Sequence, residues 1–258
     1  MTGWPMRLAR ILTVASVILL VAPLVLLIVF AFTDRGLANF PFEGPSLRWW
    51  RALLEEPGLG RAVRTSLTVS LTASVLAGVV GTLAAIGLAR LSARKAGIVI
   101  AVLALPIVLP PLLQAVALLA GASASGFGLG LHTVIGAHLL FTVPFVIIVV
   151  HGRLSGIDPA IEEAARDLGA GPVRVFRTVT MPLIGPSVVG AMLIAFALSI
   201  DDYVLTSFTI GGGNTLTTFV WGMMRTSASP VVNAIGTILI VVTMTAAALG
   251  LRMTRYRG

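Results

Sequence analysis

Two adjacent carboxylates, Asp201 and Asp202, interrupt a mainly apolar stretch that runs from Val188 to Leu205. A carboxylate in the middle of a membrane helix costs about 2.5–3.5 kcal/mol on insertion scales, so a pair is expected to face protein or water rather than lipid. Adjacent residues on a helix point about 100° apart. We therefore expect one carboxylate to face a solute pathway, where it would attract a cation, and the other to bond a neighbouring helix. A polar contact to a partner subunit is the alternative for the pair.

Other residue types that often carry catalysis are poorly placed for it. The three histidines, His132, His138 and His151, flank or line one apolar stretch without a carboxylate or nucleophile beside them in sequence, so we expect packing or interface roles. The only lysine, Lys95, is not part of a Gly-Lys-Ser/Thr phosphate-binding loop. The absence of cysteine excludes disulfides and thiolate–zinc sites. The sequence therefore predicts a chain that is not an enzyme and holds no cofactor or metal of its own.

The composition predicts an integral membrane protein. Of the 258 residues, 57% are hydrophobic and 11% are charged, and the mean hydropathy is +1.02; soluble domains are about a quarter charged. The first apolar run is too long for a signal-peptide core, so we expect it to be retained. We expect an all-α membrane protein of about six transmembrane helices, organised as a single domain, 1–258, with a core of about residues 65–250. The expected spans lie near residues 10–32, 64–89, 98–120, 132–151, 187–209 and 231–251.

The distribution of basic residues predicts the orientation. A net charge of +8 also fits nucleic-acid binding, but most of the basic residues fall on one side of the expected spans. The positive-inside rule then places both termini in the cytoplasm, and the loop from Asp34 to about Arg61 outside. In that loop, Trp49 and Trp50 are either interfacial anchors or partner contacts. The basic residues on the cytoplasmic side are Arg7, Arg10, Arg90, Arg94, Lys95, Arg153, Arg166, Arg174, Arg177, Arg252, Arg255 and Arg257.

The segment between the fourth and fifth spans, Arg153 to Pro186, is neither apolar enough to cross a membrane nor composed like a flexible linker. Asp158 is a suitable N-cap ahead of Pro159, and Gly169 is a suitable helix stop. A second short helix is expected to begin at Gly171-Pro172. The segment therefore predicts a helix–turn–helix lying along the cytoplasmic face of the membrane.

The spacing inside this segment resembles a family signature. Glu163-Ala164-Ala165 is followed after three residues by Gly169, and after nine more by Val179-Thr180-Met181-Pro182. This pattern is similar to the EAA loop of binding-protein-dependent ABC importer permeases, which reads EAA, three residues, G, nine residues, I-x-L-P. The resemblance implies the type I ABC importer permease fold and a cytoplasmic coupling helix that docks on an ABC ATPase dimer, which would bind the ATP and Mg. The coupling residues it implies are Glu163, Ala164, Ala165, Gly169 and Pro182.

Further segments look like the second permease subunit of spermidine/putrescine importers. The likeness implies a polyamine substrate, an external substrate-binding protein, a homologous second permease subunit and a place in the bacterial inner membrane. The candidate pathway residues are Asp201, Asp202, Tyr203 and Gln114. The segments that carry this likeness are Ala137-His138, Arg153-Leu154-Ser155-Gly156-Ile157-Asp158, Ser199-Ile200-Asp201-Asp202-Tyr203-Val204 and Ser229-Pro230-Val231-Val232-Asn233-Ala234.

One difference from the polyamine permeases leaves the identity of the substrate undecided. The polyamine permeases lead us to expect an acidic residue after the second proline of the third span, but here Leu105–Pro110 runs into Pro111-Leu112-Leu113-Gln114. Gln114 would offer a neutral hydrogen-bonding group, and the prolines are expected to break this helix at membrane depth. An amino-acid derivative, an organophosphonate or an iron complex is therefore an alternative substrate. An alternative of another class is an ATP-independent secondary transporter or channel that uses the acidic pair as a proton or cation site.

Overall fold

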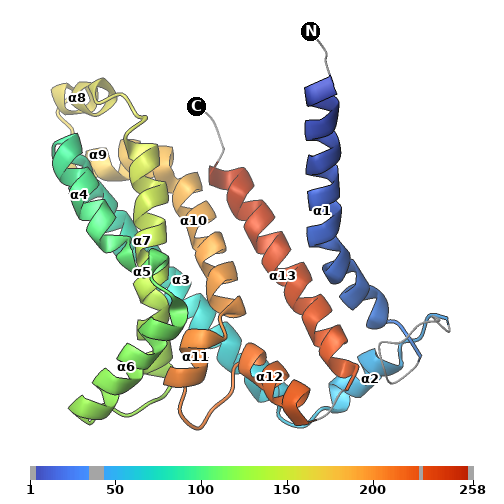
Figure 1. Ribbon diagram of the computed structural model, residues 1–258. Helices are drawn as coiled ribbons and strands as arrows, with labels where there is room; N and C mark the ends of the chain where they lie inside the picture. The colour runs from blue at the N-terminus through green and yellow to red at the C-terminus, as the bar shows by residue number, and fades with distance from the viewer. Residues whose placement is uncertain (1–3, 35–43, 227–228, 255–258) are drawn as a thin grey trace. The chain divides into compact units, whose positions relative to one another are not determined.

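The computed structural model describes residues 4–34, 44–226 and 229–254, and within them it assigns no β-strand. The predicted all-α class is thereby confirmed. Residues 35–43 of the long loop, with Arg35, lie outside the described residues, as do Arg255 and Arg257. The helices in chain order (Figure 1) are α1 (Trp4–Phe30), α2 (Arg48–Glu55), α3 (Leu59–Ala89), α4 (Ala93–Leu103), α5 (Leu105–Val108), α6 (Pro111–Ser125), α7 (Leu131–Leu154), α8 (Ala160–Asp167), α9 (Pro172–Val175), the π turn η1 (Phe176–Thr180), α10 (Met181–Asp201), α11 (Val204–Thr209), α12 (Leu216–Thr226) and α13 (Val231–Thr254).

Five helical segments among the described residues are long and apolar enough to cross a membrane. They correspond to the expected first, second, fourth, fifth and sixth spans. None of the apolar window of the first span is buried inside the chain, which suits a helix whose side chains meet lipid or another subunit. The five are Met6–Phe30, Leu59–Ala89, Leu131–Leu154, Pro172–Asp201 and Val231–Thr254.

The third span is not one helix but three pieces, α4, α5 and α6. The prolines explain the interruption, since proline lacks a backbone N–H and disfavours a helical conformation in the residue before it. Leu109, with φ −67° and ψ 140°, is extended ahead of Pro110, and α6 then begins at Pro111. The expected break is present, and it leaves α6 as a short apolar helix rather than a full-length span.

The fifth span has different bounds from those expected at 187–209. The helix begins at Pro172, so the expected second short helix of the cytoplasmic segment is instead the first part of this span. It passes through the π turn η1 and ends at Asp201. Asp202, with φ −68° and ψ 127°, leaves the helical conformation, and α11 is a separate helix. The acidic pair therefore lies at the end of a membrane helix and not within one.

The chain divides into two compact units, residues 1–59 with 220–241, and residues 60–219 with 242–258. In the first unit, the rings of Phe32 and Trp50 lie 5.3 Å apart, and the side chain of Leu27 packs against Gly236. The Trp50 ring is thus in contact with its own chain. Both candidate sites lie in the second unit.

The second unit is packed through small residues. The buried face of α3 is rich in alanine, serine and glycine. A Cβ added at Gly78 would lie 2.6 Å from Met192 of α10, and one added at Gly190 would lie 2.6 Å from the carbonyl oxygen of Gly250 in α13. Small residues let membrane helices approach closely, so that dispersion contacts hold them together where no hydrophobic driving force exists. This packing fixes α10, which has α8 at one end and α11 at the other (Figure 1).

Candidate functional site

A hollow of about 530 Å³ lies beside the end of α10 in the second unit. Its walls come from the broken third span, from α7, α10 and α11, and from the part of α13 that belongs to this unit. Most of the lining is apolar, and none of the lining residues is cationic. The lining residues that the argument uses are Gln114, Phe141, Phe145, Asp201 and Asp202.

Asp202 is tied into a buried hydrogen-bond network. Its Oδ2 accepts hydrogen bonds from the backbone N–H of Thr206, at 2.9 Å, and from the hydroxyl of Thr206, at 3.1 Å. An acceptor in this place satisfies a free N–H in the first turn of α11, as an N-cap does. The Nε2 of His138 lies 3.4 Å from the same oxygen. Asp202 thus joins α7 to the start of α11.

His138 is the functional candidate that sequence reasoning missed. The imidazole is 1% exposed, and its nitrogens lie 2.7 Å from the hydroxyl of Ser199 and 3.0 Å from that of Thr206. The packing role expected for His138 agrees with this burial. No carboxylate lies beside His138 in the sequence. In the folded chain Asp202 does, because the break after Asp201 turns Asp202 toward α7. The Ala137-His138 likeness was the one signal in the sequence that pointed to this position.

Asp201 is in a different environment from its neighbour. It lines the hollow and is exposed, and no described residue hydrogen-bonds to its carboxylate. Tyr203 lies in the turn between α10 and α11 and is not among the residues that line the hollow. Both carboxylates border the hollow, but Asp202 Oδ2 is engaged in the buried network, whereas Asp201 is exposed and has no hydrogen-bond partner among the described residues.

The Gln114 side chain hydrogen-bonds to the irregular backbone where the third span is interrupted. Its Nε2 donates to the carbonyl oxygens of Pro106, at 2.8 Å, and Leu109, at 2.9 Å. Because both partners only accept, the orientation of the amide is determined by its contacts. The Oε1 atom is buried and has no hydrogen-bond partner among the described residues. Gln114 lies three residues after Pro111, which occupies the position where an acidic residue was expected. Its side chain thus holds the irregular backbone of the break and leaves Oε1 as a buried acceptor without a partner among the described residues.

The second candidate site is α8, at the other end of α10. Asp158 Oδ1 accepts a hydrogen bond from the N–H of Ala160 at 3.0 Å, and α8 ends at Asp167, two residues before Gly169, whose φ is +82°. Only glycine adopts this left-handed conformation without strain, which explains the stop. The helix begins at Ala160, one residue later than the sequence predicted, with Pro159 in the cap position.

Most of the signature residues are exposed. Glu163 and Ala164 are exposed on α8, Gly169 follows it, and Pro182 is exposed in the first turn of α10. Leu168, between them, is 90% exposed. A large apolar side chain held in the open on a short helix suits insertion into a groove of a partner protein.

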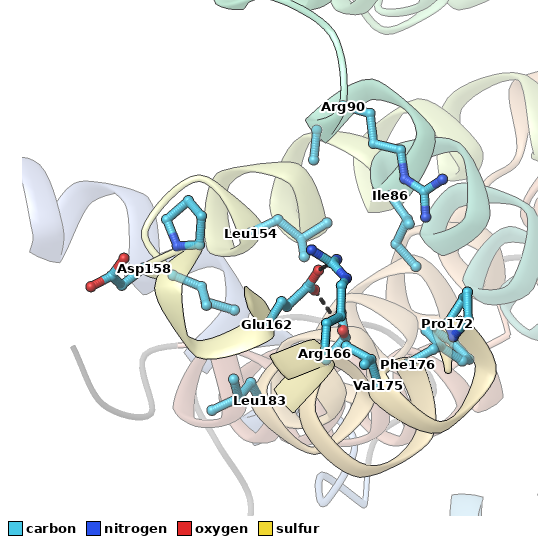
Figure 2. A pocket seen from close by; sticks show the side chains of 14 residues that line it. Ile86, Arg90, Leu154, Asp158, Glu162, Arg166, Pro172, Val175, Phe176 and Leu183 are labelled. Carbon is cyan, nitrogen blue, oxygen red and sulfur yellow. Dashed lines mark hydrogen bonds and ion pairs between the residues drawn. The ribbon is translucent and has the colours of Figure 1, made fainter. Parts of the chain in front are cut away.

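Sequence reasoning did not select Glu162. This residue of α8 extends its side chain to the π turn that precedes α10. The hydroxyl of Thr180 donates to its Oε1 at 2.7 Å, and Arg166 donates to its Oε2 at 2.7 Å. Glu162 and Arg166 line a cavity of about 220 Å³, together with Arg90, Asp158 and Phe176 (Figure 2). The spacing of Glu162 and Arg166 by four residues was visible in the sequence, whereas the contact with Thr180 was not.

Comparisons with known proteins agree with the predicted resemblance. The chain is 35% identical over 229 residues to the putrescine transport system permease protein PotI of Escherichia coli K12, covering 86% of this chain and 81% of that protein. It is 33% identical over 234 residues to the spermidine/putrescine transport system permease protein PotC of Haemophilus influenzae, covering 90% and 91%.

Solved structures share the fold. A chain of a bacterial ABC transporter involved in alginate import matches with a TM-score of 0.70 and 15% identity over 98% of this chain and 95% of that one. A chain of the inward-facing MetNI methionine ABC transporter matches with a TM-score of 0.58 and 18% identity over 78% and 98%. The profile of the family described as "Binding-protein-dependent transport system inner membrane component" matches residues 77–256. The chain therefore belongs to the family of binding-protein-dependent transport system inner membrane components.

Proposed function

We propose that this chain is a non-catalytic permease subunit of an ABC importer for polyamines, and that Asp201 attracts the cationic substrate in the pathway. The observation that carries the proposal is the exposed Asp201 carboxylate in a hollow without cationic lining residues. At a separation of 4 Å, a carboxylate and an ammonium attract each other by about 1 kcal/mol in water and by about 4 kcal/mol at an effective dielectric constant of about 20, and the exposed Asp201 lies toward the lower value. The relatives named for putrescine and spermidine transport support the same substrate class.

The walls of the hollow suit the remainder of a polyamine. Phe141 and Phe145 offer aromatic surface to methylene groups and to ammonium groups, which are attracted to ring faces. An organophosphonate is disfavoured, since its negative charge would meet Asp201 with no arginine or lysine to offset the repulsion. A cationic amino-acid derivative is the alternative that the same chemistry allows.

The partners follow from the family. We propose that a homologous second permease completes the pathway, that an external binding protein delivers substrate, and that a cytoplasmic ABC ATPase dimer binds the ATP and Mg. In this arrangement Glu163, Ala164, Ala165, Gly169 and Pro182 form the ATPase-facing surface, and both termini are cytoplasmic. Alternating access then results when closure of the ATPase dimer displaces α8 and, through it, α10.

The test is uptake into proteoliposomes that contain the chain with the ATPase, sister permease and binding protein encoded by neighbouring genes. We expect ATP-dependent uptake of labelled spermidine or putrescine that an excess of either unlabelled polyamine suppresses. A methylphosphonate and a neutral amino acid serve as competitors that should have no effect. ATP-dependent uptake of a solute other than a polyamine would overturn the substrate proposal, and uptake by this chain without an ATPase would favour a secondary transporter or channel.

A further inference from the structure

The Glu162 carboxylate links the coupling helix to the membrane helix that follows it. Its two oxygens have one partner each: Thr180 Oγ1 at 2.7 Å and Arg166 Nη2 at 2.7 Å. Thr180 is only 6% exposed, whereas Arg166 lies on the same helix as Glu162, four residues on. The internal pair orients the carboxylate along α8, and the hydrogen bond from Thr180 joins it to the neighbouring segment. Figure 2 shows Glu162 and Arg166 meeting at the cavity lined by both segments.

Among the described residues, this is the one side-chain hydrogen bond that joins α8 to another helical segment. The covalent connection between them passes through Gly169, at φ +82°, and Ala170 to the start of α9 at Pro172. A short connection that contains glycine restrains the angle between two helices weakly, because glycine has a wide range of backbone conformations. The contact of Glu162 with Thr180 therefore supplies an orientation that the connection does not.

Thr180 lies at the point where the backbone bonding at the start of α10 is irregular. It is the last residue of the π turn η1, and the N–H of Met181 bonds to the carbonyl of Phe176, five residues back. Pro182 follows in the first turn of α10. A π turn next to a proline is a weak point in a helix, since proline removes one hydrogen bond and crowds the preceding turn. A side-chain bond at this point holds the helix where its backbone bonding is irregular.

We propose that Glu162 is a positioning residue for energy coupling: its bond to Thr180 holds α8 and α10 as one rigid body throughout the transport cycle. The proposal rests on the proposed function. When the ATPase displaces α8, α10 moves with it, and the far end of α10, about 30 Å away, carries Asp201. Without the bond, α8 moves against the π turn, and ATP hydrolysis is no longer fully converted into transport.

The first test compares Thr180→Val with Thr180→Ser in the reconstituted complex. Valine has the shape of threonine without the hydroxyl, whereas serine keeps it. We expect Thr180→Val to lower the substrate transported per ATP hydrolysed by roughly three- to tenfold, the scale set by the net contribution of one typical intramolecular hydrogen bond. Thr180→Ser should stay within about twofold of the natural chain, and the KM for substrate should be unchanged in both. Normal coupling in a folded Thr180→Val complex would overturn the proposal.

A second test compares the same preparation before and after the two segments are linked, so differences in folding between variants do not enter. The natural chain has no cysteine, so the double variant Glu162→Cys, Thr180→Cys carries the only two thiols in this subunit. We expect this variant to be poorly coupled and a short bis-methanethiosulfonate linker to restore coupling in the same sample. Each single cysteine variant, treated in the same way, controls for modification without a link. Failure to restore transport, or a block by the linker, would show that the two segments must separate during the cycle.

The outcomes separate the two proposals. If the complex with the natural chain shows no ATP-dependent uptake of any polyamine, the proposed function fails, whatever the substituted chains do. If the natural complex transports and the Thr180 and cysteine variants are coupled normally, only the positioning role of Glu162 fails.

Discussion

The Nε2 of His138 lies 3.4 Å from the carboxylate Oδ2 of Asp202, and this contact joins the middle of α7 to the turn between α10 and α11. The hydroxyls of Ser199 and Thr206 complete the buried network around the imidazole. One member of the acidic pair is thereby used to hold the end of α10, which leaves Asp201 for the hollow. Four predictions follow from this and from the other close contacts of the second unit.

His138→Ala should destabilise the protein by about 2–3 kcal/mol. The substitution leaves the hydroxyl of Ser199 without its imidazole partner and removes a polar neighbour of Asp202 Oδ2, and buried polar groups that lose a partner carry a desolvation cost. Thermal unfolding in detergent measures the change. His132→Ala is the matched control on the same helix, because His132 is exposed and, among the described residues, its ring contacts only its sequence neighbours, the carbonyl of Gly128 and the ring of Phe127; it should change stability far less. Equal midpoints for the two variants would contradict a structural role for the network.

Asp201→Asn and Asp202→Asn should have different effects, although the residues are adjacent. Asp201→Asn should raise the KM for a polyamine by about tenfold with little change in unfolding, since about 1.4 kcal/mol of attraction corresponds to that factor. Asp201→Glu keeps the charge and should retain most of the affinity. Asp202→Asn should instead lower the yield and the unfolding midpoint. Uptake kinetics and thermal unfolding on the same preparations check both expectations, and a reversed pattern would exchange the two roles.

Gly190→Ala should disturb the crossing of α10 and α13. The added methyl group would lie 2.6 Å from the carbonyl oxygen of Gly250, so the helices must separate. Overpacking of this kind typically costs about 1–3 kcal/mol. Gly87→Ala, in α3 with open space around the added methyl group, is the control and should be neutral or stabilising. The measurement is the unfolding midpoint, and a neutral Gly190→Ala would mean that the two helices are farther apart than described.

Gly169→Asp should uncouple ATP hydrolysis from uptake. Asparagine and aspartate both tolerate the left-handed conformation better than most residues, so Gly169→Asn tests the backbone and Gly169→Asp adds a negative charge to the docking surface. We expect Gly169→Asn to keep at least half of the transport per ATP and Gly169→Asp to lose most of it. Uptake and ATPase activity measured in parallel give the ratio, and normal coupling in Gly169→Asp would sink the docking role of this turn.

For the fifth span, sequence reasoning located the apolar segment but did not find where its helix begins. Hydropathy located the span, but Arg174 and Arg177 made its first turns look like a separate amphipathic helix. Backbone hydrogen bonding continues through such polar turns regardless, with a π turn before Pro182. In the third span the prolines act through local sterics, and there the sequence predicted the break correctly.

Hydropathy, proline positions and the spacing from Glu163 to Pro182 were enough to locate the apolar segments, the broken helix and the family, because each depends on neighbours along the chain. The tertiary structure alone decided that Asp202 meets His138, that Asp201 faces the hollow, and that Glu162 bonds to Thr180. These contacts depend on how each helix is rotated and where it ends. Close packing between helices determines both, and residues that lie far apart in the sequence supply that packing.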